Sequence, residues 1–515
     1  MKCFFKSQLV ALGVLFILLS ATPSQAQVDL KALDEYFEKA LIDWNVPGMS
    51  VALVKDGEVV LAKGYGVREI GKKKKTDENT LYAIASNTKA FIAASLAHLV
   101  WEGKISWDDK VVDHLPYFEL YDAYATQETT IRDLLCHRVG LGTFSGDVIW
   151  YKSTYTAEET IKHAKFVPQA YSYRAGYGYS NLMFIAAGEV IHAVTGMPWD
   201  DFVRKHFFAP LDMANSVTST TKLVKLKNVA TPHKMIDDKL TPIAWTNWDN
   251  MGAAGGIISS VSDISKWLIL QMNGGIDEGD TLFSPETQVD MWTPHNNYRV
   301  GLAAQKNIPS RHFSGYGLGW GMSDYQGRKM VNHGGGYDGM YSRVTMIPEE
   351  NLGIVVLTNS MSGISTPITM RAIDEFLGTG ERDWSAEALE RAARGTKFRQ
   401  DRVAKRVEAR ELGTKTTLPL EAFVGNYYDP MYGAISVALQ EGKLVLDFAP
   451  APQLKADLSH WHFNTFKIEW HETHAWFDFG TLKFVLDNNR EVEGIEFDVP
   501  NDDIFFHEIH AKKMN

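Results

Sequence analysis

The sequence predicts a large mixed α/β unit of the α+β type followed by a small all-β domain. Strand-like runs at 48–54 and 57–63 open the first unit, and further ones return between 319 and 357 after several helices. We expect the strands from both ends of this unit to share one antiparallel sheet. Short alternating runs separated by turn residues begin near Pro419 and predict a closed all-β domain.

Length and composition are those of ordinary globular domains. The chain has 515 residues, of which 45% are hydrophobic and 22% are charged, and both values are typical of folded proteins. With 52 Lys and Arg against 63 Asp and Glu, the formal net charge is −11. This balance argues against nucleic acid as the main partner, because phosphate binding needs clustered Lys and Arg.

The first 26 residues have the pattern of a secretory signal peptide. Lys2 and Lys6 precede an apolar run at 9–21, and the residues Ser-Gln-Ala at 24–26 resemble a small-x-small cleavage site. The apolar run is short for a bilayer span, which favours cleavage after Ala26 over an uncleaved anchor. We expect a periplasmic or secreted protein with no membrane span after signal cleavage.

Composition divides the rest of the chain into three parts. Residues 27–380 form the mixed unit, and residues 381–415, with ten basic and seven acidic side chains, are expected to be a charged linker or solvated helix. Residues 416–515 form the β-rich domain. We expect this domain to modulate access to a site in the first unit rather than to supply chemistry.

The sharpest local signal is Ser86-Asn-Thr-Lys89 at the start of an apolar, helix-forming run at 90–100. Residues three apart share one face of a helix, so we expect Lys89 beside Ser86. A serine hydroxyl is a poor nucleophile until a base takes its proton, and burial lowers the pKa of a lysine. The alternative is that Ser86 only caps the helix. A second S-x-x-K at 219–222 lies in a polar stretch and is interpreted as a loop.

Two further motifs follow along the chain. Tyr179-Ser-Asn181 lies between a loop rich in Gly and Tyr and an apolar helix expected at 182–195. His333-Gly-Gly-Gly336 precedes a strand-like run that begins at Met340. Taken alone, a tyrosine is more often a packed aromatic than a base, and a glycine triplet is most often a turn.

The three motifs in this order, S-x-x-K, Y-x-N and H-x-G, resemble those of the serine β-lactamase and penicillin-binding protein superfamily. The match is closest to its class C, esterase-like and D-aminopeptidase-like branch. The resemblance covers about residues 30–380 and implies a β-lactamase-like antiparallel sheet flanked by helices, with a helical subdomain. The β-rich tail resembles the lipocalin-like domain of some D-amino-acid peptidases in this superfamily.

The resemblance also implies a role for each motif residue. Ser86 would be the acylated nucleophile, while Lys89 and Tyr179 would share the base role and return the proton to the leaving group. Asn181 would hold Lys89 and a substrate amide. The backbone N–H groups of Ser86 and Gly336 would form the oxyanion hole.

The glycine motif carries two further implications. Glycine at Gly334, Gly335 and Gly336 would let a substrate lie against the strand edge without a side-chain clash. True β-lactamases usually carry Lys-Thr-Gly as this motif, and here His333 stands in place of the lysine. An unperturbed imidazole is mostly uncharged at neutral pH, which weakens capture of a β-lactam carboxylate and favours neutral esters or amides.

We therefore expect an exported serine hydrolase that forms an acyl-enzyme on peptides or amides, including those with D-residues, or on small esters. The substrate is a small molecule or a peptide. The alternatives are a weak β-lactamase or D,D-peptidase, a covalent penicillin-binding sensor with little turnover, and a non-catalytic scaffold whose tail binds a ligand. Nothing in the sequence points to a particular oligomeric state.

No cofactor and no metal are expected. His471 and His474 are three residues apart, whereas the zinc-binding H-E-x-x-H helix needs a spacing of four. Cys136 next to His137 could suggest a thiol nucleophile, but a lone cysteine is usually a small buried hydrophobe.

Overall fold

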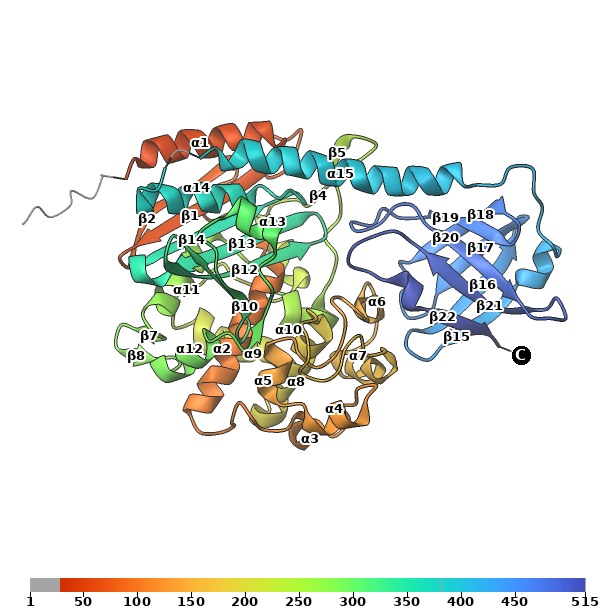
Figure 1. Cartoon of the computed structure of the whole chain (residues 1–515), viewed down its shortest axis with the longest axis horizontal. Coiled ribbons are helices and arrows are strands. Elements are labelled where there is room, and N and C mark those ends of the chain that lie inside the picture. The colour runs from red at the N-terminus through yellow and green to blue at the C-terminus, as the bar shows by residue number, and fades with distance from the viewer. Residues whose placement is uncertain (1–27, 381, 515) are drawn as a thin grey trace, which may run out of the picture.

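The computed structural model describes residues 28–380 and 382–514, so the predicted signal peptide lies outside the described residues. An antiparallel sheet between helices is followed by a closed β-barrel (Figure 1). This arrangement confirms the predicted fold class. We refer to residues 28–380 as the N-terminal domain and to the strands from Gly425 onward as the barrel.

The N-terminal domain is built on an eight-stranded sheet with the strand order β2-β1-β14-β13-β12-β11-β10-β9. β1 pairs with β14 near the end of the domain and with β2 on its other side, so strands from both ends of the domain share one sheet, as the sequence predicted. The strands are β1 (Gly48–Lys55), β2 (Glu58–Gly66), β9 (Asn296–Asn297), β10 (Ser314–Tyr316), β11 (Gly321–Tyr325), β12 (Arg328–Tyr337), β13 (Met340–Ile347) and β14 (Leu352–Thr358).

Helices cover both faces of this sheet. Val51 and Leu53 of β1 pack in one apolar cluster with α1 (Leu30–Asp43) and α14 (Ser365–Leu377). Ala52, between them, belongs to the other cluster, which includes α2 (Thr88–Trp101) and α11 (Val261–Met272). A strand buried on both faces reads as a continuous apolar run, which explains the composition of β1.

A helical subdomain lies between β2 and β9 in the sequence. Its central helix is α8 (Asn181–Thr195), which is buried along most of its length. Besides α2 and α11, the other helices between these strands are α3 (Val111–His114), α4 (Ala123–Glu128), α5 (Ile131–Leu135), α6 (Asp147–Trp150), α7 (Ala157–His163), α9 (Trp199–Val203), α10 (Gly252–Gly255) and α12 (Pro285–Met291), while α13 (Leu302–Asn307) follows β9. Three short hairpins or strand pairs complete the domain: β3 (Tyr82–Ala83) with β6 (Ile258–Ser259), β4 (His233–Ile236) with β5 (Lys239–Pro242), and β7 (Ile276–Asp277) with β8 (Asp280–Thr281).

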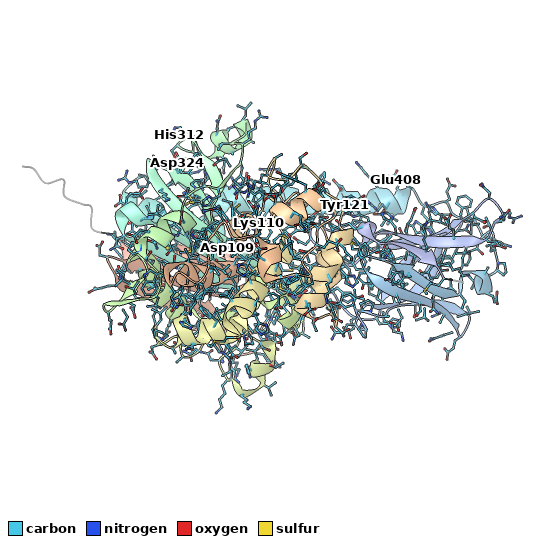
Figure 2. All side chains as sticks on the ribbon, turned by 90° about the horizontal axis from the view of Figure 1, so that it is seen from below. Asp109, Lys110, Tyr121, His312, Asp324 and Glu408 are labelled. Carbon is cyan, nitrogen blue, oxygen red and sulfur yellow. The ribbon has the colours of Figure 1, made fainter. Side chains whose placement is uncertain are left out.

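A long helix, α15 (Trp384–Glu408), connects the two domains. It is largely solvated, with Trp384 and Ser385 as its buried residues. Figure 1 shows it running from above the sheet towards the barrel, and Figure 2 places its last residue, Glu408, beside the barrel.

The barrel closes through β15 (Gly425–Asp429), β16 (Gly433–Gln440), β17 (Lys443–Phe448), β18 (Lys455–His462), β19 (Thr465–Trp470), β20 (Thr481–Leu486), β21 (Val492–Asp498) and β22 (His510–Lys513). Closure leaves no strand edge exposed to other chains.

The barrel is also bound directly to the N-terminal domain. The Lys234 ammonium of β4 donates to the His474 carbonyl and, at 2.6 Å, to the Asp478 carboxylate. The Tyr155 hydroxyl donates to the Tyr432 carbonyl at 3.0 Å. These contacts hold the loop between β19 and β20, and the turn between β15 and β16, against the N-terminal domain.

Two local predictions were wrong. The motif from His333 to Gly336 was expected before a strand, and the structure places it inside β12. A Cβ on Gly335 would lie 2.2 Å from the Ile84 carbonyl oxygen. Glycine is therefore needed here because β12 and the Ile84 segment approach each other closely, and not because the chain turns. Gly319-Trp320, expected as strand, lies in the turn between β10 and β11, where Gly319 has a φ of 76°.

Within residues 28–380 and 382–514, no single helix has the length and apolar character needed to cross a membrane. Only α8 taken together with the helical stretch Trp199–Phe208, at a bend of 76°, satisfies those two criteria.

Candidate active site

Ser86 lies in a short 3-10 helix, Ala85–Asn87, that leads into α2. The preceding Ala85 has a φ of 47°, a conformation that residues other than glycine rarely adopt. Gly335 of β12 packs against the carbonyl of Ile84 just before this turn. The strand and the helix start are therefore in direct contact, and Ser86 is exposed between them to a cavity.

The Lys89 side chain is fully buried one turn further along α2. Its Nζ lies 2.7 Å from Asn181 Oδ1, 2.8 Å from the Ala254 carbonyl oxygen and 3.1 Å from Ser86 Oγ. The first two partners can only accept hydrogen bonds. A neutral Lys89 amine satisfies both with its two hydrogens, which leaves its lone pair for the Ser86 hydroxyl.

Burial lowers the pKa of Lys89 to about 7, while the charge of Asp147 opposes that shift. A substantial fraction of Lys89 is thus unprotonated at neutral pH. The three-residue spacing places the Lys89 amine, which can accept a proton, beside the Ser86 hydroxyl.

Asn181, at the start of α8, connects Lys89 to a buried carboxyl group. Its Nδ2 donates to Asp147 Oδ2 at 2.6 Å, while its Oδ1 accepts from Lys89. Burial raises the pKa of Asp147 to about 8, partly offset by hydrogen bonds from Trp150 and Asn181. Asn181 therefore bridges Lys89 and Asp147, and Asp147 in turn fixes which way the amide faces.

Tyr179 lies over Lys89, with Lys89 Nζ 4.8 Å from the centre of the phenol ring. Burial raises the pKa of Tyr179 well above its ordinary value, and the Ser86 hydroxyl opposes that rise. The side chain is therefore a phenol at neutral pH. It is suited to donate or relay a proton rather than to act as a phenolate base.

His333 is uncharged. Burial and the charge of Lys89 lower its pKa to about 3, although its contact with the Gly334 carbonyl acts the other way. Its Nδ1 lies 2.6 Å from the Gly334 carbonyl oxygen, and its Nε2 lies 2.7 Å from the Tyr316 hydroxyl. The carbonyl can only accept, so Nδ1 carries the hydrogen and Nε2 accepts from Tyr316. Both ring nitrogens are occupied, and no positive charge stands where β-lactamases place a lysine.

The glycine motif borders a free strand edge. β11 pairs with β12 only as far as Asn332, whereas the pairing of β12 with β13 continues to Tyr337. Gly334 and Gly336, beyond Asn332, line the cavity beside Ser86. Gly335 instead packs against Ile84, so the three glycines serve two different purposes.

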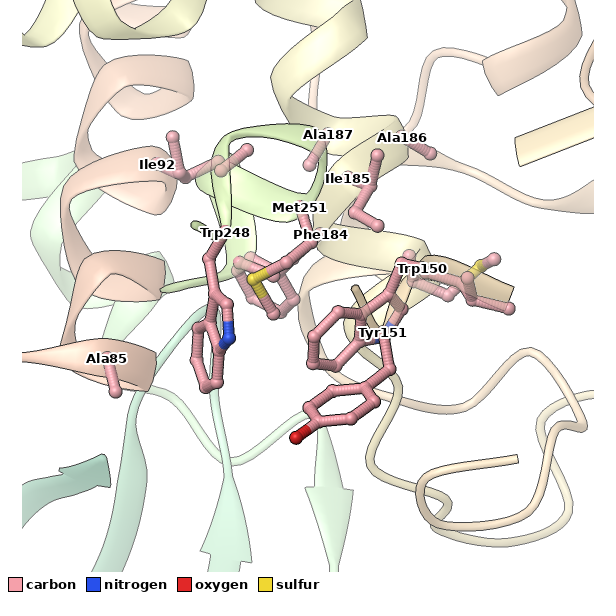
Figure 3. Packing of buried hydrophobic residues seen from close by; sticks show 14 of the residues in the cluster. Ala85, Ile92, Trp150, Tyr151, Phe184, Ile185, Ala186, Ala187, Trp248 and Met251 are labelled. Atoms are coloured by element: carbon pink, nitrogen blue, oxygen red, sulfur yellow. The ribbon is translucent and has the colours of Figure 1, made fainter. Parts of the chain in front are cut away.

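The cavity over Ser86 has a volume of about 300 Å³, and several aromatic side chains form part of its walls. Phe144, Trp150 and Trp248 come from the N-terminal domain, and Figure 3 shows Trp150 and Trp248 packed near Met251 and Phe184. Three further lining residues come from barrel loops: Trp476, Asp503 and Ile504. The barrel therefore forms part of the cavity wall.

The structure adds site residues that sequence reasoning missed. His137 is fully buried, accepts the Ser180 N–H at Nδ1 and packs with its ring centre 4.3 Å from that of Tyr179. In the sequence it stood out only as the neighbour of Cys136. Asp147, Trp476 and Asp503 had no comparable signal, because only tertiary packing brings them to Ser86.

Other sequence candidates lie elsewhere. Ser219 caps an exposed 3-10 helix, Thr220–Lys225, rather than a loop. Cys136 is buried, and burial raises the pKa of its thiol to about 12. His471 and His474 lie in the loop between β19 and β20, not on a strand. Among the described residues, no group of three or more His, Cys, Asp or Glu is placed to hold a metal.

Comparison with known proteins agrees with this geometry. A family model described as Beta-lactamase matches residues 33–375, and one described as Domain of unknown function (DUF3471) matches residues 409–513. The unguisins hydrolase ungD of Aspergillus violaceofuscus is 28% identical over 447 residues, 81% of this chain and 79% of that protein. Protein flp of Staphylococcus aureus is 27% identical over 343 residues, 64% of this chain and 62% of that protein.

Solved structures share the fold. The octameric penicillin-binding protein homologue from Pyrococcus abyssi aligns with a TM-score of 0.62 at 21% identity, covering 94% of this chain and all of that one. A D-stereospecific amidohydrolase from Streptomyces sp. aligns with a TM-score of 0.54 at 22% identity, covering 68% of this chain and all of that one. The Beta-lactamase model matches more than half of the residues, so the chain belongs to the Beta-lactamase family and is a serine hydrolase.

Proposed function

We propose that the protein is an exported hydrolase that forms an acyl-enzyme on Ser86 and cleaves amide or ester bonds in peptides or small molecules. The observation that carries this proposal is the hydrogen bonding of Lys89. Its two short contacts, to Asn181 and Ala254, go to groups that only accept, so the neutral amine has its lone pair free for Ser86 at 3.1 Å.

In the acylation step, Ser86 Oγ forms a bond to the substrate carbonyl carbon while its proton passes to Lys89 Nζ. The N–H groups of Ser86 and Gly336 bind the oxyanion. When the intermediate collapses, the bond to the leaving group breaks. The Tyr179 phenol protonates that group and regains a proton from Lys89. A water molecule then releases the acyl group by the same route in reverse.

The cavity favours acyl groups that are apolar, and uncharged or cationic. Its walls include several aromatic rings, His333 is neutral, and Asp503 contributes a carboxyl group at the barrel side. Burial and the neighbouring Asp502 raise the pKa of Asp503 to about 6, so it is mostly ionised at neutral pH. A free amine on the substrate complements this charge, whereas a carboxylate does not.

The names of two relatives, an unguisins hydrolase and a D-stereospecific amidohydrolase, support an amide or peptide substrate, including one with D-residues. The neutral His333 argues against efficient β-lactam hydrolysis.

A substrate panel tests this function. We expect turnover of a nitrophenyl ester and of D- or L-amino-acid amides with a free amine, faster than of their N-acetylated forms. A chromogenic β-lactam should be a poor substrate, and Ser86→Ala should abolish turnover of every compound. Stable penicillin labelling of Ser86 without turnover of the ester or the amides would instead support the sensor alternative.

Export has its own test. After expression in a bacterium, we expect the mature protein outside the cytoplasm with an N-terminus at Gln27. An intact N-terminus on a cytoplasmic protein would contradict export.

A further inference from the structure

The carboxylate of Glu508, a barrel residue, contacts the N-terminal domain. The segment between β21 and β22 contains a 3-10 helix, Phe506–Glu508, whose Phe506 is fully buried among aromatic rings of the barrel. Glu508, two residues later, accepts hydrogen bonds from the Ser145 hydroxyl and, at 2.8 Å, from the Gly146 N–H. Because Phe506 anchors this short helix in the barrel, the barrel sets the position of Glu508.

Glu508 binds the middle of a segment whose two ends contact catalytic groups. At one end, Thr143 Oγ1 accepts the Tyr179 N–H at 3.2 Å, and the Phe144 N–H donates to the Tyr179 carbonyl at 2.8 Å. At the other end, Asp147 accepts from the Asn181 amide at 2.6 Å. A displacement of residues 145–146 would therefore move the supports of both Tyr179 and Asn181.

The segment has little room to adjust by itself. Gly146 has a φ of 80° and caps α6. A Cβ on Gly146 would lie 2.8 Å from the Leu182 side chain of α8. The backbone is thus packed tightly against α8 on one side and held by Glu508 on the other.

Burial raises the pKa of Glu508, and its hydrogen bonds with Ser145 and Gly146 act against that rise. A half-buried carboxylate of this kind is costly unless its donors are in place. The contact therefore forms only when residues 145–146 and the barrel are correctly positioned relative to each other.

We propose that Glu508 is a positioning residue for catalysis. By holding Ser145 and Gly146, it fixes Asp147 and, through Asn181, the amine of Lys89. The inference rests on the proposed role of Lys89 as the base for Ser86. The barrel would then help to position the catalytic groups, in contrast to the expectation that it only modulates access to the site.

The test measures the rate at which a fluorophosphonate labels Ser86, as a function of pH, in full-length variants. Glu508→Ala should slow labelling at neutral pH by about 10- to 100-fold, the range expected when catalytic groups lose their alignment. The pH of half-maximal rate should rise, because a loosened site admits water and lets the pKa of Lys89 return towards its ordinary value. Affinity for the probe should change little.

Glu508→Gln should restore most of the rate. Its amide oxygen can accept from Gly146 while its NH₂ donates to Ser145 Oγ, since a hydroxyl can also accept. Ser145→Ala removes the contact with Glu508 from the other side, so it should by itself slow labelling, and combining it with Glu508→Ala should slow labelling less than the two single effects predict. Ser145→Ala keeps the proposal testable even if Glu508→Ala fails to fold.

Tyr155→Phe is the matched control, because it removes another hydrogen bond between barrel and N-terminal domain, to Tyr432, away from the 143–147 segment. We expect it to leave labelling nearly unchanged. Equal rates and pH profiles in wild type, Glu508→Ala and Tyr155→Phe would overturn the positioning role, as would a wild-type labelling rate in Ser145→Ala. Failure of the wild-type protein to be labelled at all would instead refute the proposed function.

Discussion

The indole ring of Trp476, a barrel residue, lies against Gly336 of β12: a Cβ on this glycine would be 3.2 Å from the ring. Gly336 belongs to the free edge of β12 beside Ser86. The barrel therefore covers the edge along which a substrate backbone would lie. Lys234 holds the same barrel loop through the His474 carbonyl and the Asp478 carboxylate, so the ring is fixed where it limits the cavity.

Replacing Trp476 should widen the range of substrates. Trp476→Ala removes the ring from the cavity wall, so we expect kcat/KM for esters with bulky acyl groups to rise relative to acetyl esters, by about tenfold or more, since a matched change in pocket volume is commonly worth 1–3 kcal/mol. Trp461→Ala is the control, because Trp461 stacks with Arg410 elsewhere on the barrel. An unchanged ratio of bulky to small esters in Trp476→Ala would show that this ring does not limit the acyl group.

The rate of acylation should follow the deprotonation of Lys89. Burial lowers the pKa of Lys89 to about 7, and only its neutral form can take the Ser86 proton. Single-turnover acylation should therefore rise as the pH increases through about 7 and then level off. A profile that is flat between pH 5 and 9, or that falls as the pH rises, would be inconsistent with Lys89 as the base.

Tyr179→Phe removes one hydroxyl and should leave the fold intact, because the backbone of Tyr179 is held independently by Thr143 and Phe144. The phenol is expected to pass a proton to the leaving group, and general acid–base catalysis commonly contributes ~10²–10⁴-fold. The loss should be larger for amides than for nitrophenyl esters, whose leaving group needs no proton. If both substrates lose less than about fivefold, Tyr179 is only a packed aromatic residue.

His333→Lys should shift reactivity towards β-lactams. It places a positive charge where the neutral imidazole now accepts from Tyr316, and charge-assisted contacts to carboxylates are roughly twice as strong as neutral ones. We expect the ratio of β-lactam to neutral ester acylation, measured with a chromogenic β-lactam and a nitrophenyl ester, to rise about tenfold. A shift of this ratio towards the ester would mean that His333 has a different role.

The candidate site was predictable where its residues are close neighbours in the sequence. Ser86 lies in the 3-10 helix that leads into α2 and Lys89 lies in the first turn of α2, while Tyr179 lies two residues before Asn181, the first residue of α8, so short motifs describe their local geometry. The strand β1 was also predictable from the sequence, because it is a continuous apolar run.

The rest depends on packing between distant segments. Asp147 is an acidic residue in a loop-rich region, with no pattern to distinguish it from a solvated aspartate. Trp476 and Glu508 lie in barrel loops more than three hundred residues after Ser86, and no spacing rule connects them to it. The role of the barrel at the site therefore became visible only with the two domains in contact.

The central claim is that Ser86 becomes acylated with Lys89 as its base, and the most direct measurement is the intact mass and peptide map of protein treated with a fluorophosphonate. We predict a single adduct on Ser86 that is absent in Ser86→Ala and present at the wild-type level in Ser219→Ala, where the same S-x-x-K spacing begins an exposed 3-10 helix. An adduct that persists in folded Ser86→Ala, or that maps to another residue, would contradict the account.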